Sequence, residues 1–214
     1  RTAGWEASQE QSNPKGTGVS HLAINSFVRR SYLMVSVLDR QGVENSWTHD
    51  ADVVILDLGD TVPDGEKSAA RALVKESIPM AARGAAEVFV RINRPLAQAD
   101  IEASVWPGLG GIVYAGAETG PEIDVADSLL TKMEGRHGVE ERSLQIAILL
   151  ESGKGVWNIR EVLTASPRVT SVGLDEINLC RSLGIVPDAD FDPLVYAKGR
   201  IVIEGRAARV QPVG

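Results

Sequence analysis

Short apolar runs alternate with longer segments of helical period along most of the chain. Each run is continuous and rich in Val, Ile or Leu, which is typical of a strand buried on both faces in a parallel sheet. Six runs predict six strands, and a shorter run near the end of the sequence is a candidate seventh. The strands are expected over residues 32–38, 52–58, 87–93, 111–116, 144–152 and 168–175, with the seventh over 208–213.

The segments between these runs predict helices. Asp64 is a candidate N-cap for the first of them, and Pro121 suits the first turn of the second. A strand–helix alternation of this kind predicts a parallel α/β fold, which is either a closed barrel or an open doubly wound sheet. An open sheet would usually carry a Gly-rich phosphate loop after its first strand, and the absence of this motif favours a barrel. The helices are expected over residues 65–82, 121–135, 153–165 and 192–208.

The sequence therefore predicts a TIM-type (β/α) barrel that is incomplete, with six to seven βα units visible and the last strand missing. A full barrel typically takes about 250 residues, whereas this chain has 214. We expect residues 19–214 to form this barrel as a single domain. Residues 1–18 are polar and contain Gly, Pro and Ser, so they are expected to form a flexible tail.

Composition narrows the classes of partner. With 43% apolar and 24% charged residues, the chain has the make-up of a soluble globular protein. The net charge of −7 argues against a nucleic-acid partner, which requires a basic surface. No apolar run approaches the roughly 18 residues of a membrane span, so no membrane partner is expected. Cys180 is the only cysteine, which excludes an internal disulfide and favours the cytoplasm.

Polar residues follow several predicted strands at the end where barrel enzymes carry their chemistry. Carboxylates follow the second, fourth, fifth and sixth strands, and an arginine lies at the end of the third. Carboxylate oxygens suit Mg²⁺ or Mn²⁺ better than Zn²⁺, and an arginine beside them could bind a carboxylate or stabilise an enolate oxygen. A single strand-end carboxylate more often caps a helix or pairs with an arginine, so a structural interpretation also stands.

Four segments resemble the citrate lyase β-subunit/HpcH–HpaI aldolase family. The similarity runs from about residue 31 to residue 214, and the segments taken together are specific to this family. The segments are DADVVILDLGDTVPDGEKSAAR (50–71), FVRIN (89–93), ILLESGKGVWNIREVLTASPRVTSVGLDEINLCRSLG (148–184) and DPLVYAKGRIVIEGRAA (192–208).

The resemblance implies a TIM-barrel lyase or aldolase, often a trimer or hexamer, that cleaves or forms a carbon–carbon bond next to a carbonyl. The implied substrates are citryl- or malyl-CoA-like thioesters or hydroxy-keto acids, which release an acetyl-thioester or a 2-oxo acid. The resemblance also implies a Mg²⁺ held by Glu151 and by an acid after the sixth strand. Arg91 would contact the substrate carboxylate or the enolate oxygen.

The chain departs from the family pattern at several of these positions. In a gapless register the family's metal-binding Asp falls on Asn178, with Asp175 close by, and Gly59 replaces one acid of the DLED motif. Three interpretations stay open: a metal-dependent lyase with an altered substrate, a catalytically degenerate barrel that acts as a regulatory or ligand-binding protein, or an unrelated activity on the same fold.

The candidate site residues fall into three overlapping groups. Mg²⁺ or Mn²⁺ is the expected cofactor, a small-molecule acyl-CoA or 2-oxo acid is the expected partner, and a homo-oligomer is the expected assembly. The catalytic candidates are Arg91, Glu151 and Asp57; the substrate-binding candidates are Arg91, Asn93, Glu118 and Asp60; and the candidate metal ligands are Glu151, Asn178 and Asp175.

Overall fold

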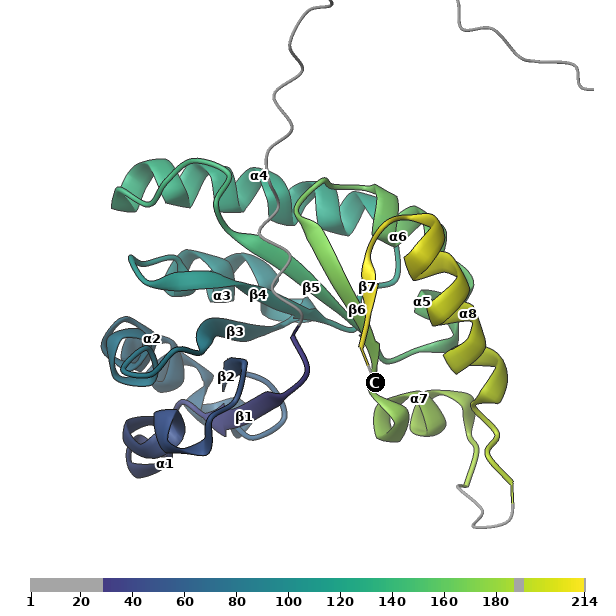
Figure 1. Ribbon diagram of the computed structural model, residues 1–214, viewed down its shortest axis with the longest axis horizontal. Helices are drawn as coiled ribbons and strands as arrows, with labels where there is room; N and C mark the ends of the chain where they lie inside the picture. The colour runs from purple at the N-terminus through teal and green to yellow at the C-terminus, as the bar shows by residue number, and fades with distance from the viewer. Residues whose placement is uncertain (1–28, 187–190, 214) are drawn as a thin grey trace, which may run out of the picture.

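Seven parallel strands form one sheet in chain order, from β1 to β7 (Figure 1). The computed structural model describes residues 29–186 and 191–213, so the tail predicted over 1–18 lies outside the described residues. The strands are β1 (Tyr32–Ser36), β2 (Val53–Asp57), β3 (Glu87–Asn93), β4 (Leu109–Ala115), β5 (Gln145–Leu150), β6 (Val169–Leu174) and β7 (Gln211–Pro212).

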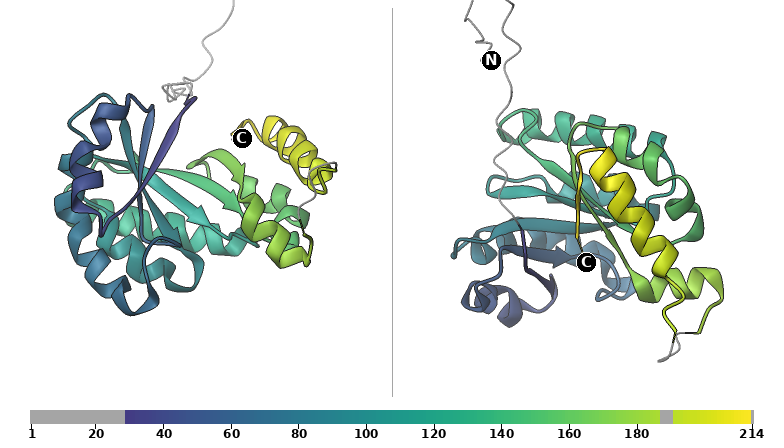
Figure 2. Two further views of the ribbon diagram at one scale, coloured as in Figure 1. Left: turned by 90° about the horizontal axis from the view of Figure 1, so that it is seen from below. Right: turned by 45° about the vertical axis from the view of Figure 1, so that its right-hand side comes forward.

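The sheet curves into a half-barrel, with β1 and β7 at its two ends (Figure 2). In the described part of the chain, β1 pairs only with β2, and β7 pairs only with β6. The prediction of a parallel α/β fold with six to seven strands is confirmed. A closed TIM barrel is not formed by these strands.

Helices connect successive strands and cover the convex face of the sheet (Figure 2). The prediction over 153–165 is too coarse, because this segment forms two short helices, α5 and α6, that meet at Asn158. Asp64 does not cap α2, because it lies in the 3₁₀ turn η2 that precedes this helix. The helices are α1 (Arg40–Asn45), η1 (Ser46–His49), η2 (Asp64–Glu66), α2 (Lys67–Ala81), η3 (Arg94–Leu96), α3 (Ala97–Ser104), α4 (Gly120–His137), α5 (Gly153–Trp157), α6 (Ile159–Thr164), α7 (Glu176–Leu183) and α8 (Val195–Ala207).

Apolar side chains fill both faces of the curved sheet. The larger core lies between the sheet and the helices, and a smaller cluster built around Ile55 and Phe89 lies on the concave face. Successive strand residues point to opposite faces. Asp57 on β2 and Arg91 on β3 each lie two residues beyond a member of the concave cluster, and the two are paired in register. Both side chains therefore face the inside of the half-barrel.

A buried ion network at the opposite end of the strands is built around Arg168 of the ASPRV segment. Arg168, just before β6, is buried and reaches across to α4. Its guanidinium binds both oxygens of the fully buried Glu134 carboxylate and also binds the carboxylate of Asp127. Its hydrogen bonds run to Asp127 (2.7 Å), Thr131 (2.9 Å), the Leu144 carbonyl (2.9 Å) and both oxygens of Glu134 (2.8 and 2.7 Å).

Across residues 29–186 and 191–213, no helix combines the length and the apolar character that crossing a bilayer would require.

Candidate active site at the carboxyl ends of the strands

Arg91 is the centre of a group of charged side chains at the carboxyl ends of the strands. It is only 2% exposed, and its guanidinium lies 3.3 Å from Asp57, 2.9 Å from Asp60 and 2.8 Å from Glu151. Asp175 is 4.0 Å away. Burial acts to lower the pKa of Arg91, but the nearby carboxylates outweigh it and raise that pKa. A permanently charged cation is thus surrounded by an excess of carboxylates.

Asp57 is a buried hydrogen-bond partner of Arg91. It is fully buried, and its Oδ1 accepts hydrogen bonds from the Gly59 amide (2.7 Å) and from Arg91. Its Oδ2 accepts from the amide (2.9 Å) and the hydroxyl (2.7 Å) of Thr61. Both oxygens are used inside the protein. Asp57 was predicted to be catalytic; these contacts tie it to Arg91, and its catalytic role stays a prediction.

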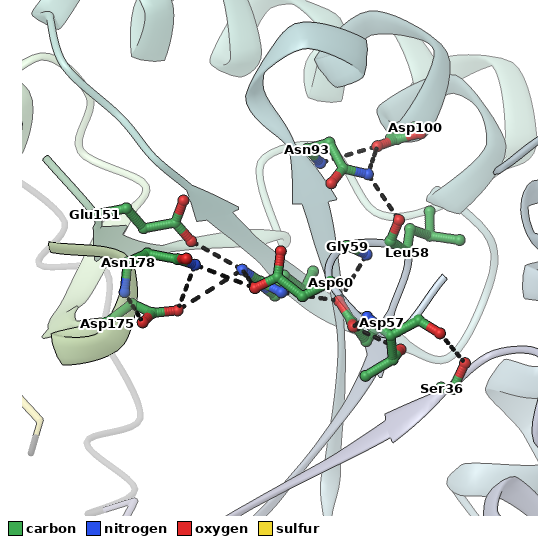
Figure 3. Close-up of polar contacts among 12 residues, drawn as sticks. Ser36, Asp57, Leu58, Gly59, Asp60, Asn93, Asp100, Glu151, Asp175 and Asn178 are labelled. Atoms are coloured by element: carbon green, nitrogen blue, oxygen red, sulfur yellow. Dashed lines mark hydrogen bonds and ion pairs between the residues drawn. The ribbon is translucent and has the colours of Figure 1, made fainter. Parts of the chain in front are cut away.

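Three carboxylates face one another across the mouth of the half-barrel (Figure 3). Asp60, Glu151 and Asp175 each offer an oxygen, and these oxygens lie within 4.8 Å of one another. Burial raises the pKa of Glu151, with Asp175 and Asp60 acting in the same direction and Arg91 opposing them. This all-oxygen set has the chemistry that Mg²⁺ or Mn²⁺ prefers.

Burial also acts to raise the pKa of Asp60, but hydrogen bonds from Arg91 and Asn178 outweigh it and hold that pKa below its usual range. Asp60 therefore stays ionised beside Glu151. It was predicted only to bind substrate, and the geometry adds it to the candidate metal ligands.

Asn178 lies beside this group but presents its amide nitrogen to it (Figure 3). That nitrogen donates to Asp60 at 3.2 Å and to Asp175 at 3.0 Å, while the side-chain oxygen accepts from Arg181 at 2.6 Å. Asn178 was predicted to be a metal ligand. In this structure its side-chain oxygen accepts a hydrogen bond from Arg181 while its nitrogen bridges two carboxylates, and its role as a metal ligand stays a prediction.

Asn93 and Glu118 line the same pocket, which has a volume of about 410 Å³ and also contains Arg91 and Glu151. The Asn93 amide donates to the Leu58 carbonyl at 2.7 Å, so it fixes the loop after β2. Among the residues that the structure describes, neither side chain forms a hydrogen bond or ion pair with Arg91, and their role in binding substrate stays a prediction.

Two arginines of this pocket were not among the predicted residues. Arg94 binds Glu118 at 3.0 Å and Glu122 at 2.6 Å, and Arg181 binds Asn178. Arg94 directly follows the end of β3, and Arg181 lies about one helical turn beyond Asn178. The same strand-end reasoning could have found the first. The second required knowledge of the helix α7.

Comparison with known proteins agrees with this fold. The family model described as HpcH/HpaI aldolase/citrate lyase matches residues 30–214. The citrate lyase subunit beta of Leuconostoc mesenteroides subsp. cremoris is 30% identical over 189 residues, which cover 87% of this chain and 63% of that protein. The L-malyl-CoA/beta-methylmalyl-CoA lyase of Rhodobacter capsulatus is 27% identical over 141 residues, covering 63% of this chain and 44% of that protein. The chain thus spans less than two thirds of the length of these relatives.

Solved structures show the same architecture. Protein CitE from Mycobacterium tuberculosis, in complex with magnesium and acetoacetate, has a TM-score of 0.64 and 20% identity, covering 86% of this chain and 72% of that chain. RipC from Yersinia pestis has a TM-score of 0.65 and 20% identity, covering 86% of this chain and 74% of that chain. At this level of identity, the likeness concerns the fold alone.

Proposed function

Because this chain belongs to the HpcH/HpaI aldolase/citrate lyase family, we propose that it carries the active site of a carbon–carbon lyase. The proposed substrate is a citryl- or malyl-CoA-like thioester or a hydroxy-keto acid, and the products include an acetyl-thioester or a 2-oxo acid. One observation carries the proposal: the buried Arg91 guanidinium lies among the carboxylates of Asp60, Glu151 and Asp175 at the mouth of the half-barrel. The activities named for the relatives support it.

The residues fit the divalent metal ion that this activity implies. Asp60, Glu151 and Asp175 bring one oxygen each into one small space, and Arg91 alone does not balance the negative charge around it. In the proposal these three carboxylates hold Mg²⁺, or Mn²⁺ in its place. A bound ion would act as a Lewis acid that polarises the substrate oxygen next to the bond that breaks.

Arg91 is proposed to bind the negative charge that the reaction creates. Cleavage next to a thioester leaves the bonding electron pair on an enolate, and a fixed guanidinium offsets this charge without reorganising. Asp57 keeps Arg91 in place, and the 2.7 Å bond from Gly59 keeps Asp57 in place. Asn93 and Glu118 are proposed to contact the rest of the substrate from the walls of the pocket.

The proposal is tested by calorimetry and by a product assay. Mg²⁺ is titrated into wild type, Glu151→Gln and the control Glu140→Gln, with and without oxaloacetate or pyruvate; Glu140 is exposed and outside the pocket. Release of acetyl-CoA from citryl-CoA and malyl-CoA is then followed with added Mg²⁺. We expect Glu151→Gln to weaken metal binding and abolish release, and Glu140→Gln to match wild type. Equal metal affinity in all three proteins would remove Glu151 from the site.

One observation favours a second candidate, a degenerate barrel that binds ligand without turnover. The side-chain nitrogen of Asn178 donates to Asp60 and Asp175 and its oxygen accepts from Arg181, where the family resemblance implies an acidic ligand. This candidate predicts that Mg²⁺ and pyruvate bind to folded wild-type protein while neither thioester is cleaved. Acetyl-CoA release that depends on Glu151 would reject it.

We also propose that the chain assembles as a homo-oligomer, as the family resemblance implies. Large apolar side chains are exposed on one long face of α8, a pattern typical of a protein–protein contact. Light scattering after size-exclusion chromatography measures the assembly, and a monomer at every concentration would contradict the proposal. The exposed side chains on α8 are Val195, Tyr196, Val202 and Ile203.

A further inference from the structure

Gly59 lies in the loop after β2, directly against the guanidinium of Arg91. A Cβ atom at Gly59 would lie 2.6 Å from Nη1 and 3.0 Å from Cζ of Arg91, and 2.8 Å from Oδ1 of Asp57. These contacts are shorter than any normal van der Waals contact. Gly59 is not one of the glycines with positive φ, so its backbone conformation is open to alanine. In this chain the obstacle to a side chain at position 59 is therefore space and not backbone conformation.

The loop cannot withdraw to make that space, because its backbone is fixed on several sides. The Gly59 amide donates to Asp57 at 2.7 Å, and the Gly59 carbonyl accepts from the buried Lys67 ammonium at 2.7 Å. The adjacent Leu58 carbonyl accepts from Lys67 at 2.9 Å and from Asn93 at 2.7 Å. An added methyl group must therefore move the guanidinium.

The guanidinium is also held, but only by side chains. Its Nη1 donates to Asp57, its Nη2 donates to Asp60 and Glu151, and its Nε has no hydrogen-bond partner within the described residues. A displacement of a few tenths of an ångström would lengthen these bonds. It would also change the direction in which Nη2 faces the pocket.

We infer that Gly59 is a positioning residue for Arg91: the missing side chain gives the guanidinium its place and aims it at the mouth of the half-barrel. For its effect on ligand binding, this inference rests on the proposed function. For the place of Arg91 itself, it rests on the geometry alone. Small misplacements of a group that must meet a charge can cost on the order of a hundredfold.

The test compares Gly59→Ala with Gly65→Ala, which makes the same change six positions along the same loop. A Cβ at Gly65 would have no atom within 4 Å. The first measurement is the Arg91 Nε–H signal in a proton–nitrogen correlation spectrum, assigned by its loss in Arg91→Lys. We expect Gly59→Ala to shift this signal, and Gly65→Ala to leave it unchanged. An unchanged signal in folded Gly59→Ala would overturn the inference.

The second measurement is the affinity for oxalate in the presence of Mg²⁺, with oxalate as a probe for an enolate-like dianion. Gly59→Ala is expected to weaken it about tenfold to a hundredfold, with Gly65→Ala at the wild-type value. If wild type binds no oxalate and cleaves no thioester, the proposed function fails. The Arg91 signal still decides the role of Gly59 in that case.

A double variant covers the case in which Gly59→Ala is too unstable for spectroscopy. The drop in melting temperature caused by Gly59→Ala is measured in wild type and in Arg91→Lys, which lacks the guanidinium. If the clash is with Arg91, the drop is large in the first background and small in the second. Equal drops would assign the clash to the loop itself and overturn the inference.

Discussion

Arg168 gives a quantitative test of how the strand ends are held in register. It lies just before β6, whose other end carries Asp175, and it joins this strand to α4. Replacing Arg168 with Met keeps the apolar stem but removes the guanidinium. Among the described residues, the fully buried carboxylate of Glu134 would then keep two backbone partners, the amides of Arg142 (2.8 Å) and Leu144 (3.0 Å).

The loss of folding stability expected for Arg168→Met follows from the burial of this ion pair. Removing one partner of a buried ion pair typically costs about 3–5 kcal/mol, because a charge is left buried and unpaired. That is a large part of the roughly 5–15 kcal/mol by which a typical domain is stable. At about 2–4 °C per kcal/mol for a chain of this size, Arg168→Met should lower the melting temperature by roughly 6–20 °C.

The matched control is Arg160→Met. Arg160 forms its ion pair with Glu204 at 2.8 Å, but its side chain is 72% exposed. An exposed pair of this kind contributes about 0–1 kcal/mol. Both variants are unfolded with heat and with urea, and followed by circular dichroism at neutral pH. Equal losses of stability in the two variants would refute the argument from burial.

The cost of losing Arg168 should also depend on pH. Burial acts to raise the pKa of Glu134, but hydrogen bonds from Arg168 and two backbone amides outweigh it and lower that pKa. The pKa of Asp127 is lowered in the same way by Ser166 and Arg168 against the effect of burial. A carboxyl whose pKa is lowered in the folded state stabilises the protein at neutral pH, and this stability is lost as the pH falls through that value. The gap between wild type and Arg168→Met should therefore shrink in acid; a constant gap would contradict the assignment.

Three further changes have definite expected outcomes. Asp60→Asn should weaken Mg²⁺ binding about tenfold or more in calorimetry, because a loss of roughly 1.4 kcal/mol of binding free energy corresponds to a tenfold loss of affinity. The control Asp64→Asn, which lies outside the pocket, should leave the affinity unchanged. Gly111→Ala should cost about 1–3 kcal/mol in urea unfolding, because its Cβ would overlap the backbone of β5, whereas Gly135→Ala meets open space and should not destabilise. Asp39→Ala should cost about 1 kcal/mol, because the Asp39 carboxylate caps α1 through a 2.9 Å bond; a neutral result in thermal unfolding would reject this cap.

The strands were predictable because a parallel sheet is buried on both faces. The expected run over 87–93 coincides with β3, and the other five main strands differ by only a few residues at each end. Helices α1, α3 and α7 were not predicted, since six to eight residues hold about two turns and show too little periodicity. The candidate seventh strand over 208–213 contains β7, but β7 is only two residues long because its extent depends on pairing with β6, which a linear pattern does not reveal.

The sequence predicted the location of the candidate site better than it predicted the role of each residue in it. Strand-end reasoning selected Arg91, Glu151, Asp60 and Asp175, and the structure brings these four together. The sequence could not tell that Asp57 is fully enclosed, because its burial depends on how the loop to Thr61 turns back. Position along a strand predicts which end of the sheet a residue reaches, and loop conformation decides whether solvent reaches it.

Asn178 shows why one change of residue type can reassign the roles of its neighbours. Asp175 caps α7 by accepting from the backbone amide of Asn178, so the two side chains are held close together at the start of the helix. A carboxylate at position 178 would place a further negative charge against Asp60 and Asp175. The amide instead donates a hydrogen bond to each of them and turns its oxygen to Arg181. An exchange of acceptor for donor thus stabilises the two carboxylates side by side, and in the proposed metal site Asp60 supplies the oxygen that the family resemblance would take from position 178.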